Sequence, residues 1–390
     1  MSVDDVATIT AASFRAVGRN GVGLEMEWLV FDRTDATAPV AVERVRSAIG
    51  DTPLPSGGSV SFEPGGQLEI STVRFENAQA ALTALDDDHA EASGRLAQHG
   101  LRLVALGIDP ERGPVRSLRL PRYDAMELAF DHRGPHGRFM MCSTASLQIN
   151  VDFGPDPFLS WRAVSAIAPV VAAIFANSPV HQGTTARFAS TRSEVWRHID
   201  PTRTTAVPME SSDVAELWAR YALDANVLLV RTPDGAEPVV GDFTLRSWID
   251  TGHRLGFPDT EDLRYHLTTL FPPVRPRGWM EVRMIDAIPA NARSVAVALI
   301  DAVAREPGRF TDVVAVCSNL VAARNGDQWR VAAHGLHDDD VYTAAVELLR
   351  CAPPVINLTS PQLADEATTW FESMVRRRRT PADSPLSDRS

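Results

Sequence analysis

The sequence predicts an α+β fold, in which a mixed sheet forms from the first part of the chain and a helical part follows. Strand and helix patterns alternate without any internal repeat up to about residue 290, and the chain is mainly helical from 291 to 379. Strands followed by a run of helices are typical of α+β rather than doubly wound proteins. With 390 residues, 44% apolar and 23% charged, the composition is that of an ordinary globular chain of one large domain or two.

Four separate stretches predict strands with one apolar and one polar face: 22–31, about 58–74, 138–152 and 278–285. Successive side chains of a strand point to opposite faces, so each stretch buries one row and presents the other. The polar rows comprise Glu25 and Glu27, then Gln67 and Glu69, then Gln148, Asn150 and Asp152, and finally Glu281 and Arg283.

If these strands share one sheet, five acids, three amides and one Arg lie on the same concave floor. Carboxylates that close repel one another and take up protons unless a cation lies among them. The second stretch adds Glu63, separated from Glu69 by Pro-Gly-Gly-Gln-Leu, and its glycines allow a tight turn or a close approach to a ligand. The pattern therefore predicts a cluster of hard divalent metal ions.

The remaining elements follow from apolar spacing and from breakers. We expect, in chain order, a helix over 78–99, a strand over 101–107, loop and short helix over 121–137, a helix over 157–176 that ends at Asn177-Ser178-Pro179, mixed loops over 180–260, a helix over 260–270 and a disordered tail over 380–390.

Composition excludes several classes of function. The net charge of -12 argues against nucleic acid as a partner. We find no signal peptide and no stretch approaching the roughly 20 apolar residues of a membrane span. Cys142, Cys317 and Cys351 have unrelated spacings, which fits structural thiols in a reducing cytoplasm. The chain has no lysine, which excludes a Walker-type loop and Schiff-base chemistry.

Taken singly, each motif also has a purely structural interpretation. Glu25 and Glu27 could form a solvated strand face, and the polar row of the third stretch could line an open sheet. The segment from Arg275 to Arg283 could be a basic loop before an edge strand, and His266 is more often a packed histidine than a ligand. The same asymmetry in four strands favours a metal site.

Several stretches together carry a specific resemblance. They read VGLEMEW, SFEPGGQLEIS, MMCSTASLQINVDF, FANSP and HLTTLFPPVRPRGWMEVRMIDA. The chain resembles the glutamate–cysteine ligases of the plant and actinobacterial type, and most of all those that open ergothioneine biosynthesis in actinobacteria. The resemblance implies a glutamine synthetase-like sheet, curved and mostly antiparallel, with helices on its outer face. It also implies one catalytic domain over 1–379, with its sheet core over about 20–290.

The resemblance implies an activity as well: ATP-dependent joining of the glutamate γ-carboxylate to the amine of L-cysteine through a γ-glutamyl phosphate. Two or three Mg²⁺ ions would then be held by Glu25, Glu27, Glu63, Glu69, Glu281 and Gln148. Gln148 stands where bacterial relatives carry a metal-binding His. Glu281 and Arg283 match the Glu-x-Arg pair of glutamine synthetase, so both are candidate catalytic residues, and Arg283 would hold the γ-phosphoryl group in flight.

Substrate contacts are predicted from family-like segments. Arg122, Arg192 and Arg203 are candidates for the glutamate α-carboxylate, Tyr123 and Trp196 for a substrate pocket, Gln67 and Asn150 for further substrate contacts, and Arg275 and Arg277 for nucleotide phosphates. Two alternatives stay open: a ligase of this fold that uses another amine, and a catalytically silent protein that binds glutamate or nucleotide. The sequence leaves the oligomeric state open, a monomer included.

Overall fold

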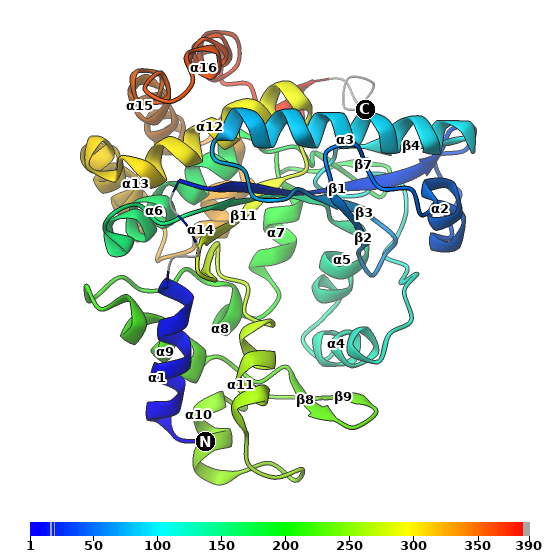
Figure 1. Ribbon diagram of the computed structural model, residues 1–390, viewed down its shortest axis with the longest axis vertical. Helices are drawn as coiled ribbons and strands as arrows, with labels where there is room; N and C mark the ends of the chain where they lie inside the picture. Colours follow the sequence, from blue (N-terminus) through cyan, green and yellow to red (C-terminus); the bar gives the residue numbers. More distant parts are fainter. Residues whose placement is uncertain (16–17, 19, 385–390) are drawn as a thin grey trace.

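The computed structural model describes residues 1–15, 18 and 20–384. One seven-stranded sheet contains all four predicted polar-faced strands (Figure 1). Its order is β10-β11-β5-β1-β3-β2, with β4 pairing to β1, and the pairings are antiparallel. The strands are β1 (Val22–Asp32), β2 (Ser59–Phe62), β3 (Leu68–Ser71), β4 (Leu101–Val104), β5 (Ser146–Val151), β10 (Val274–Pro276) and β11 (Met280–Asp286). The predicted α+β class with a mostly antiparallel sheet is confirmed.

The strand register brings the polar rows together. Glu25 is the Cα partner of Gln148, and Glu27 is the partner of Glu69. Glu281 pairs with Asn150. Partners directly across a sheet point to the same face, so the acidic and amide residues of separate strands share one floor, as the alternation predicts.

Helices cover the opposite, apolar face of the sheet. In Figure 1, α3 and α12 lie along it, and the apolar rows beneath them, such as Leu24, Ile149 and Val282, are fully buried. The helices of this layer and of the C-terminal part are α3 (Ala78–Gln98), α6 (Pro157–Ile174), α12 (Ala290–Arg305), α13 (Thr311–Ala323), α14 (Gln328–Ala333), α15 (Asp339–Ile356) and α16 (Pro361–Ser373).

Helix α6 is the one described helix whose length and composition alone would allow it to cross a membrane. Most of it is buried in this structure, where it contacts α12, α13, α14 and β11. It therefore behaves as a core helix.

The polar face of the sheet looks toward a second group of elements (Figure 1). The segments nearest to it are α4 (Pro121–Asp131), α5 (His136–Ser143), α7 (Thr191–Arg197) and α8 (Pro201–Thr204). Beyond them, a small lobe with its own apolar cluster around Val6 and Trp248 comprises α1 (Val3–Ala11), α9 (Val214–Asp224), β8 (Leu229–Thr232), β9 (Gly235–Pro238), α10 (Leu245–Thr251) and α11 (Thr260–Leu267). The remaining short elements are α2 (Val42–Ile49), β6 (Val180–His181) and β7 (Thr184–Thr185).

Two local predictions are wrong. The third predicted strand begins only at Ser146, because residues 138–143 belong to α5; a short apolar run does not distinguish strand from helix by periodicity. Residues 380–383, expected to be disordered, form a capped turn in which Thr380 is buried and the Ala382 N–H donates to the Ala176 carbonyl at 3.0 Å. The rest of the predicted tail, 385–390, lies outside the described residues.

The predictions for His266 and the cysteines agree with the structure. His266 is buried, and its Nε2 lies 3.0 Å from the Ala222 carbonyl. Cys142 and Cys317 are buried, Cys351 is half-buried, and all three are free thiols. Burial raises the pKa of Cys142 and of Cys317 to about 12, so neither thiol is activated as a nucleophile.

Candidate active site

Three carboxylates converge at the junction of β1, β3 and the turn before β3. Glu27, Glu63 and Glu69 each place an oxygen within 4.8 Å of the other two. Burial raises the pKa of all three, and most strongly that of Glu63, where repulsion from Glu27 and Glu69 adds to burial. Repulsion from Glu27 also raises the pKa of Glu69. Three oxygen donors at this spacing fit a hard divalent cation, which would favour the ionised form of all three acids.

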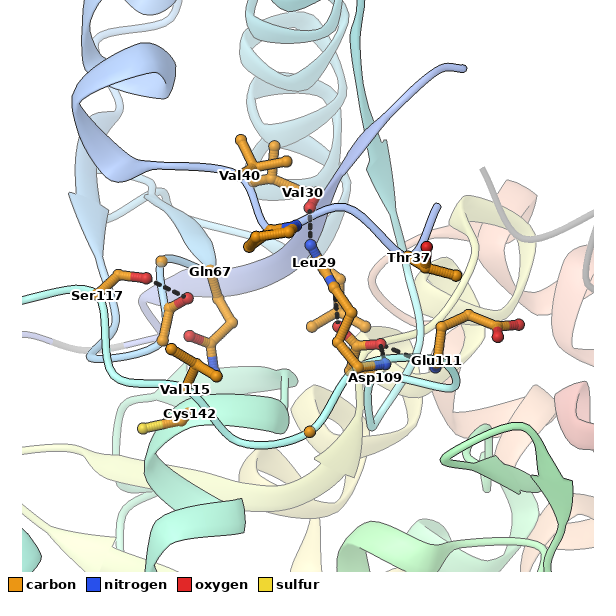
Figure 2. A pocket seen from close by; sticks show the side chains of 15 residues that line it. Leu29, Val30, Thr37, Val40, Gln67, Asp109, Glu111, Val115, Ser117 and Cys142 are labelled. Carbon is orange, nitrogen blue, oxygen red and sulfur yellow. Dashed lines mark hydrogen bonds and ion pairs between the residues drawn. The ribbon is translucent and has the colours of Figure 1, made fainter. Parts of the chain in front are cut away.

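The turn that carries Glu63 depends on two glycines. Gly66 has φ of 92°, a conformation that favours glycine, and its N–H donates to the Glu63 carbonyl at 2.8 Å. A Cβ on Gly65 would lie 2.0 Å from the Cys142 carbonyl oxygen, so only glycine lets the turn pack against the end of α5. From outside, Ser117 Oγ donates to the Gly65 carbonyl at 3.2 Å, next to a cavity of about 280 Å³ (Figure 2).

Glu27 is held in place by neighbouring donors. The Ser146 N–H donates to Glu27 Oε2 at 2.8 Å, and Gln148 Nε2 donates to Glu27 Oε1 at 3.2 Å. The oxygen of the same amide, Gln148 Oε1, accepts a hydrogen bond of 2.6 Å from Arg283 Nη1. The carboxylate cluster and the Arg of the Glu-x-Arg pair are therefore connected through one amide.

Arginine side chains surround a further acid, Glu281, which is 1% exposed. Arg275 donates to both of its carboxylate oxygens, at 2.6 and 3.1 Å. Arg283 lies 3.0 Å and Arg277 3.3 Å from the same carboxylate. Burial alone would raise the pKa of Glu281, but these guanidinium groups together lower it. Glu281 is thus an ionised acid in an Arg cluster.

Glu25 lies between the carboxylate cluster and Glu281. It accepts a hydrogen bond of 2.9 Å from Asn150 Nδ2. Burial raises its pKa first, followed by repulsion from Glu281 and then from Glu69. The floor of the sheet is therefore continuous from the carboxylate cluster to the Arg cluster.

A cavity of about 300 Å³ opens beside the carboxylate cluster. Its lining includes Glu27, Glu63, Gln67, Arg122, Tyr123, Met126, Met140, Gln148, Arg192, Trp196, Phe271 and Arg283. Four polar atoms of this lining are buried without a hydrogen-bond partner among the described residues: Gln67 Oε1, Arg192 Nε, Trp196 Nε1 and Arg283 Nε. Buried polar atoms are nearly always paired, so these three donors and one acceptor are unsatisfied polar groups in the wall.

A second cavity, of about 290 Å³, lies at the other end of the same floor. Gly21, Gly23, Glu25, Asn150 and Trp279 are among its lining residues. Trp279 Nε1 donates to Asn150 Oδ1 at 2.9 Å, which fixes the indole ring. Gly23 leaves the floor open, whereas the Arg74 guanidinium lies over Gly21.

The comparison with known families decides the identity of this fold. The model of glutamate–cysteine ligase family 2 matches residues 21–367. The chain belongs to this family. The predicted resemblance is therefore confirmed, and the carboxylate cluster lies in the part of the chain that carries it.

Individual relatives agree with this assignment. The chain is 38% identical over 385 residues to the glutamate–cysteine ligase EgtA of Mycolicibacterium smegmatis, covering 96% of this chain and 87% of that relative. It is 30% identical over 242 residues to the chloroplastic glutamate–cysteine ligase of Brassica juncea, covering 59% and 46%. The glutamate–cysteine ligase of Francisella tularensis, solved in complex with AMP, has the same fold at 12% identity, with a TM-score of 0.58 over 95% of this chain and 84% of that one.

Of the three arginines predicted to bind the glutamate α-carboxylate, two reach the first cavity and one does not, while Gln67, Tyr123 and Trp196 also line it. Arg192 is buried in its wall and donates to the carbonyls of Met284 and Arg283. Arg122 reaches it from α4. Arg203 is fully buried, and its guanidinium bonds to Asp200, Thr269 and Asn226. It supports the lobe and does not line the cavity.

The predicted phosphate-binding Arg residues are placed differently from one another. Arg275 is buried, and its guanidinium bonds to Glu281 and the Leu270 carbonyl. Arg277 is 48% exposed in its side chain. Both line a third cavity, of about 330 Å³, with Arg264. Of these two residues, only Arg277 has an exposed guanidinium.

Trp279 and Asp152 also belong to the polar floor, and the sequence motifs alone do not show their roles. Trp279 was not predicted as a site residue, although it precedes Glu281 by two positions, so the strand alternation already places both on one face. Asp152 belongs to the polar row but pairs with Arg74 and accepts from the Gly21 N–H at 2.8 Å. It closes the end of the sheet.

Proposed function

We propose that this ligase joins the γ-carboxylate of L-glutamate to the amine of L-cysteine with consumption of ATP. The observation that carries the proposal is the carboxylate cluster of Glu27, Glu63 and Glu69, which opens, next to Arg283, into a cavity with unpaired polar atoms. A carboxylate is a poor acyl donor, so it must first become a γ-glutamyl phosphate. That chemistry needs cations, a guanidinium and an amino-acid site together.

Glu27, Glu63 and Glu69 would hold one Mg²⁺, and Glu25 would contribute to a second. Mg²⁺ prefers such oxygen donors together with substrate phosphates. Bound there, it would neutralise the repulsion between the triphosphate and the attacking carboxylate. The carboxylate of Glu281 is already compensated by Arg275, Arg277 and Arg283, which disfavours its predicted role as a metal ligand.

The protein's own groups would orient the reactants. Arg283 has an unpaired, buried Nε beside the cluster, where it would donate to oxygens of the transferring phosphoryl group. Arg192 Nε and Trp196 Nε1, also unpaired, would donate to a substrate α-carboxylate. Gln67 Oε1 would accept from an α-ammonium group. Arg122 and Tyr123 would complete the wall of this amino-acid cavity.

The nucleoside would occupy the second cavity. Trp279 offers a flat ring that suits the stacking of a base. Gly23 leaves the floor open beside it, and the Arg74 guanidinium covers Gly21. A triphosphate that extends from there passes Glu25 on its way to the carboxylate cluster. Arg277 would meet its phosphates from the side of the Arg cluster.

The balance of the reaction gives a direct test. A carboxylate oxygen of glutamate attacks the γ-phosphorus of ATP and ADP leaves; the amine then attacks the acyl carbon, loses a proton, and phosphate leaves with that oxygen. Glutamate labelled with ¹⁸O in its γ-carboxylate should therefore yield phosphate with one ¹⁸O, ADP and γ-glutamylcysteine, measured by mass spectrometry. Cysteine-dependent turnover without label transfer would refute the acyl-phosphate route.

A panel of amines separates the alternatives. ADP release with L-cysteine, L-serine, L-alanine, 2-aminobutyrate and no amine should be fastest with cysteine. Equal rates with several amines would indicate a ligase with another acceptor. Nucleotide binding without any turnover would indicate a silent binding protein.

The biological setting follows from the resemblance. The product would feed ergothioneine biosynthesis. A deletion strain should lack ergothioneine, and added γ-glutamylcysteine should restore its synthesis. The three free thiols suit the cytoplasm, and fractionation of tagged protein would check this location.

A further inference from the structure

Gln148 lies at the centre of the polar floor and is 5% exposed. It is the Cα partner of Glu25 on one side. On the other side, the register of β11 shifts between Val282 and Ile285, so that Arg283 and Met284 bulge opposite it. A bulge of this kind re-aims a side chain. Here it brings the Arg283 guanidinium to the amide of Gln148.

The chemistry of its neighbours fixes which end of the amide faces which group. A guanidinium can only donate hydrogen bonds, so the atom 2.6 Å from Arg283 Nη1 must be the amide oxygen. The carboxylate of Glu27 accepts, so the atom 3.2 Å from its Oε1 is the amide nitrogen. Flipping the amide would set donor against donor and acceptor against acceptor. The oxygen of Gln148 is therefore directed to Arg283.

This bridge orients groups on both sides. With Gln148 and the Ser146 N–H bound to its two oxygens, Glu27 is fixed with respect to Glu63 and Glu69. Arg283 is fixed between Gln148 and Glu281, which leaves its unpaired Nε for the cavity.

We propose that Gln148 is a positioning residue, which holds the Arg283 guanidinium and the Glu27 carboxylate in a fixed mutual geometry, and that it is not a cation ligand. The proposal rests on the proposed function, because that function requires Arg283 and the carboxylate cluster to act on the same phosphoryl group. A misplacement of about 1 Å between such groups can cost about 100-fold in rate. It differs from the role that the family resemblance implies, in which the residue at this position binds metal.

The test separates cation binding from turnover. Mn²⁺ binding to the full-length protein, without substrates, would be titrated by electron paramagnetic resonance of the free ion. Gln148→Leu should bind the same number of Mn²⁺ ions per chain as the wild type, since no ligand is lost, whereas the Kd can weaken by about 10- to 100-fold because Glu27 loses a hydrogen bond. Its kcat should fall by about 10- to 100-fold, while KM for glutamate and cysteine changes much less.

Two further variants control for folding. Gln148→Met keeps the length of the side chain and should show the same split if Gln148→Leu fails to fold. Gln328→Leu removes another buried amide, whose Nε2 donates to the Thr204 carbonyl away from the floor. It should lose stability in thermal unfolding but keep both kcat and Mn²⁺ binding.

Two results would overturn the proposal. Loss of one Mn²⁺ per chain in the Gln148 variants would make this residue a ligand, and an unchanged kcat would remove its positioning role. Failure of the proposed function is distinguishable from both results, because the wild type itself would then show no cysteine-dependent label transfer.

Discussion

Replacing Glu63 by Gln should stabilise the protein in the absence of divalent cations and abolish the stabilisation that Mg²⁺ provides. The reason is the carboxylate cluster, in which Glu63 lies with Glu27 and Glu69 and has a pKa raised well above its ordinary value of 4.5. A cation bound by the proposed cluster would relieve this repulsion. Glutamine keeps the shape of the side chain and removes the charge.

The magnitude follows from the spacing. Two unit charges at the 4.8 Å limit of the cluster repel by roughly 3.5 kcal/mol at an effective dielectric constant of about 20. Glu63 has two such neighbours, so full ionisation would cost about 7 kcal/mol. Protonating Glu63 at pH 7 is cheaper: at about 1.4 kcal/mol per pH unit above 4.5, it costs about 3.4 kcal/mol. Because the wild type would take the cheaper route and protonate Glu63, that cost is the most that Glu63→Gln can recover. We expect its free energy of unfolding in the absence of cations to rise by about 1–3 kcal/mol.

Denaturant unfolding at pH 7 in EDTA and in millimolar Mg²⁺ would measure both effects. Mg²⁺ should stabilise the wild type by about 1.4 kcal/mol for each tenfold excess over its Kd, and should leave Glu63→Gln almost unchanged. Glu43→Gln, an exposed acid on α2, is the matched control and should behave as wild type. A destabilised Glu63→Gln in EDTA, or one with the full Mg²⁺ effect, would refute the cluster as a cation site.

Three further outcomes are expected. Trp196→Phe keeps the ring but removes an unpaired N–H of the cavity, so KM for one amino-acid substrate should rise about 5- to 10-fold, as for a lost hydrogen bond of about 1 kcal/mol, with kcat nearly kept; an unchanged KM would contradict the α-carboxylate contact. Trp279→Ala should raise KM for ATP about 10- to 100-fold, as for loss of base stacking, without affecting KM for glutamate; the reverse pattern would exchange the two cavities. Burial, followed by the charge of Arg293, lowers the pKa of His89 from 6.5 to about 4. Between these values only the unfolded chain takes up a proton, so the free energy of unfolding of the wild type should fall by up to about 1.4 kcal/mol per pH unit on acidification. His89→Phe, which can still stack on Trp28, should reduce that slope in denaturant titrations at pH 7.5 and 5, and equal slopes would reject the assignment.

Strand periodicity was enough to predict the floor of the site. Alternation placed Glu25, Glu27 and Glu69 on one face of their strands, and the register confirms that strands far apart in sequence bring them together. The turn at Glu63 was also readable, because two glycines next to acids favour a close backbone approach. These features depend on local chain geometry, which sequence patterns carry.

The cavity walls depend on tertiary packing, which local patterns do not carry. Arg192 and Arg203 looked equivalent in sequence, since both occur in short polar segments of similar composition. Packing separates them: Arg192 reaches β11 and the first cavity, whereas Arg203 is enclosed by Asp200 and lobe carbonyls. The contact of Gln148 with Arg283 depends on a bulge in β11. The sequence of β11 contains no glycine or proline that would indicate this bulge.

The absence of lysine has a consequence for how charge is arranged on this floor. Every cationic side chain is Arg, whose charge persists at all relevant pH values and whose planar fork can hold a carboxylate through two bonds. Arg275 binds Glu281 in this way, so Glu281 is ionised and compensated by protein, whereas Glu27, Glu63 and Glu69 lack comparable compensation. The floor is thereby divided into an end with uncompensated carboxylates and an end already neutralised by guanidinium groups, with Gln148 and Arg283 at the boundary. A phosphoryl group in transfer would meet cations on one side and Arg283 on the other, and both sides would be needed because neither alone balances its charge.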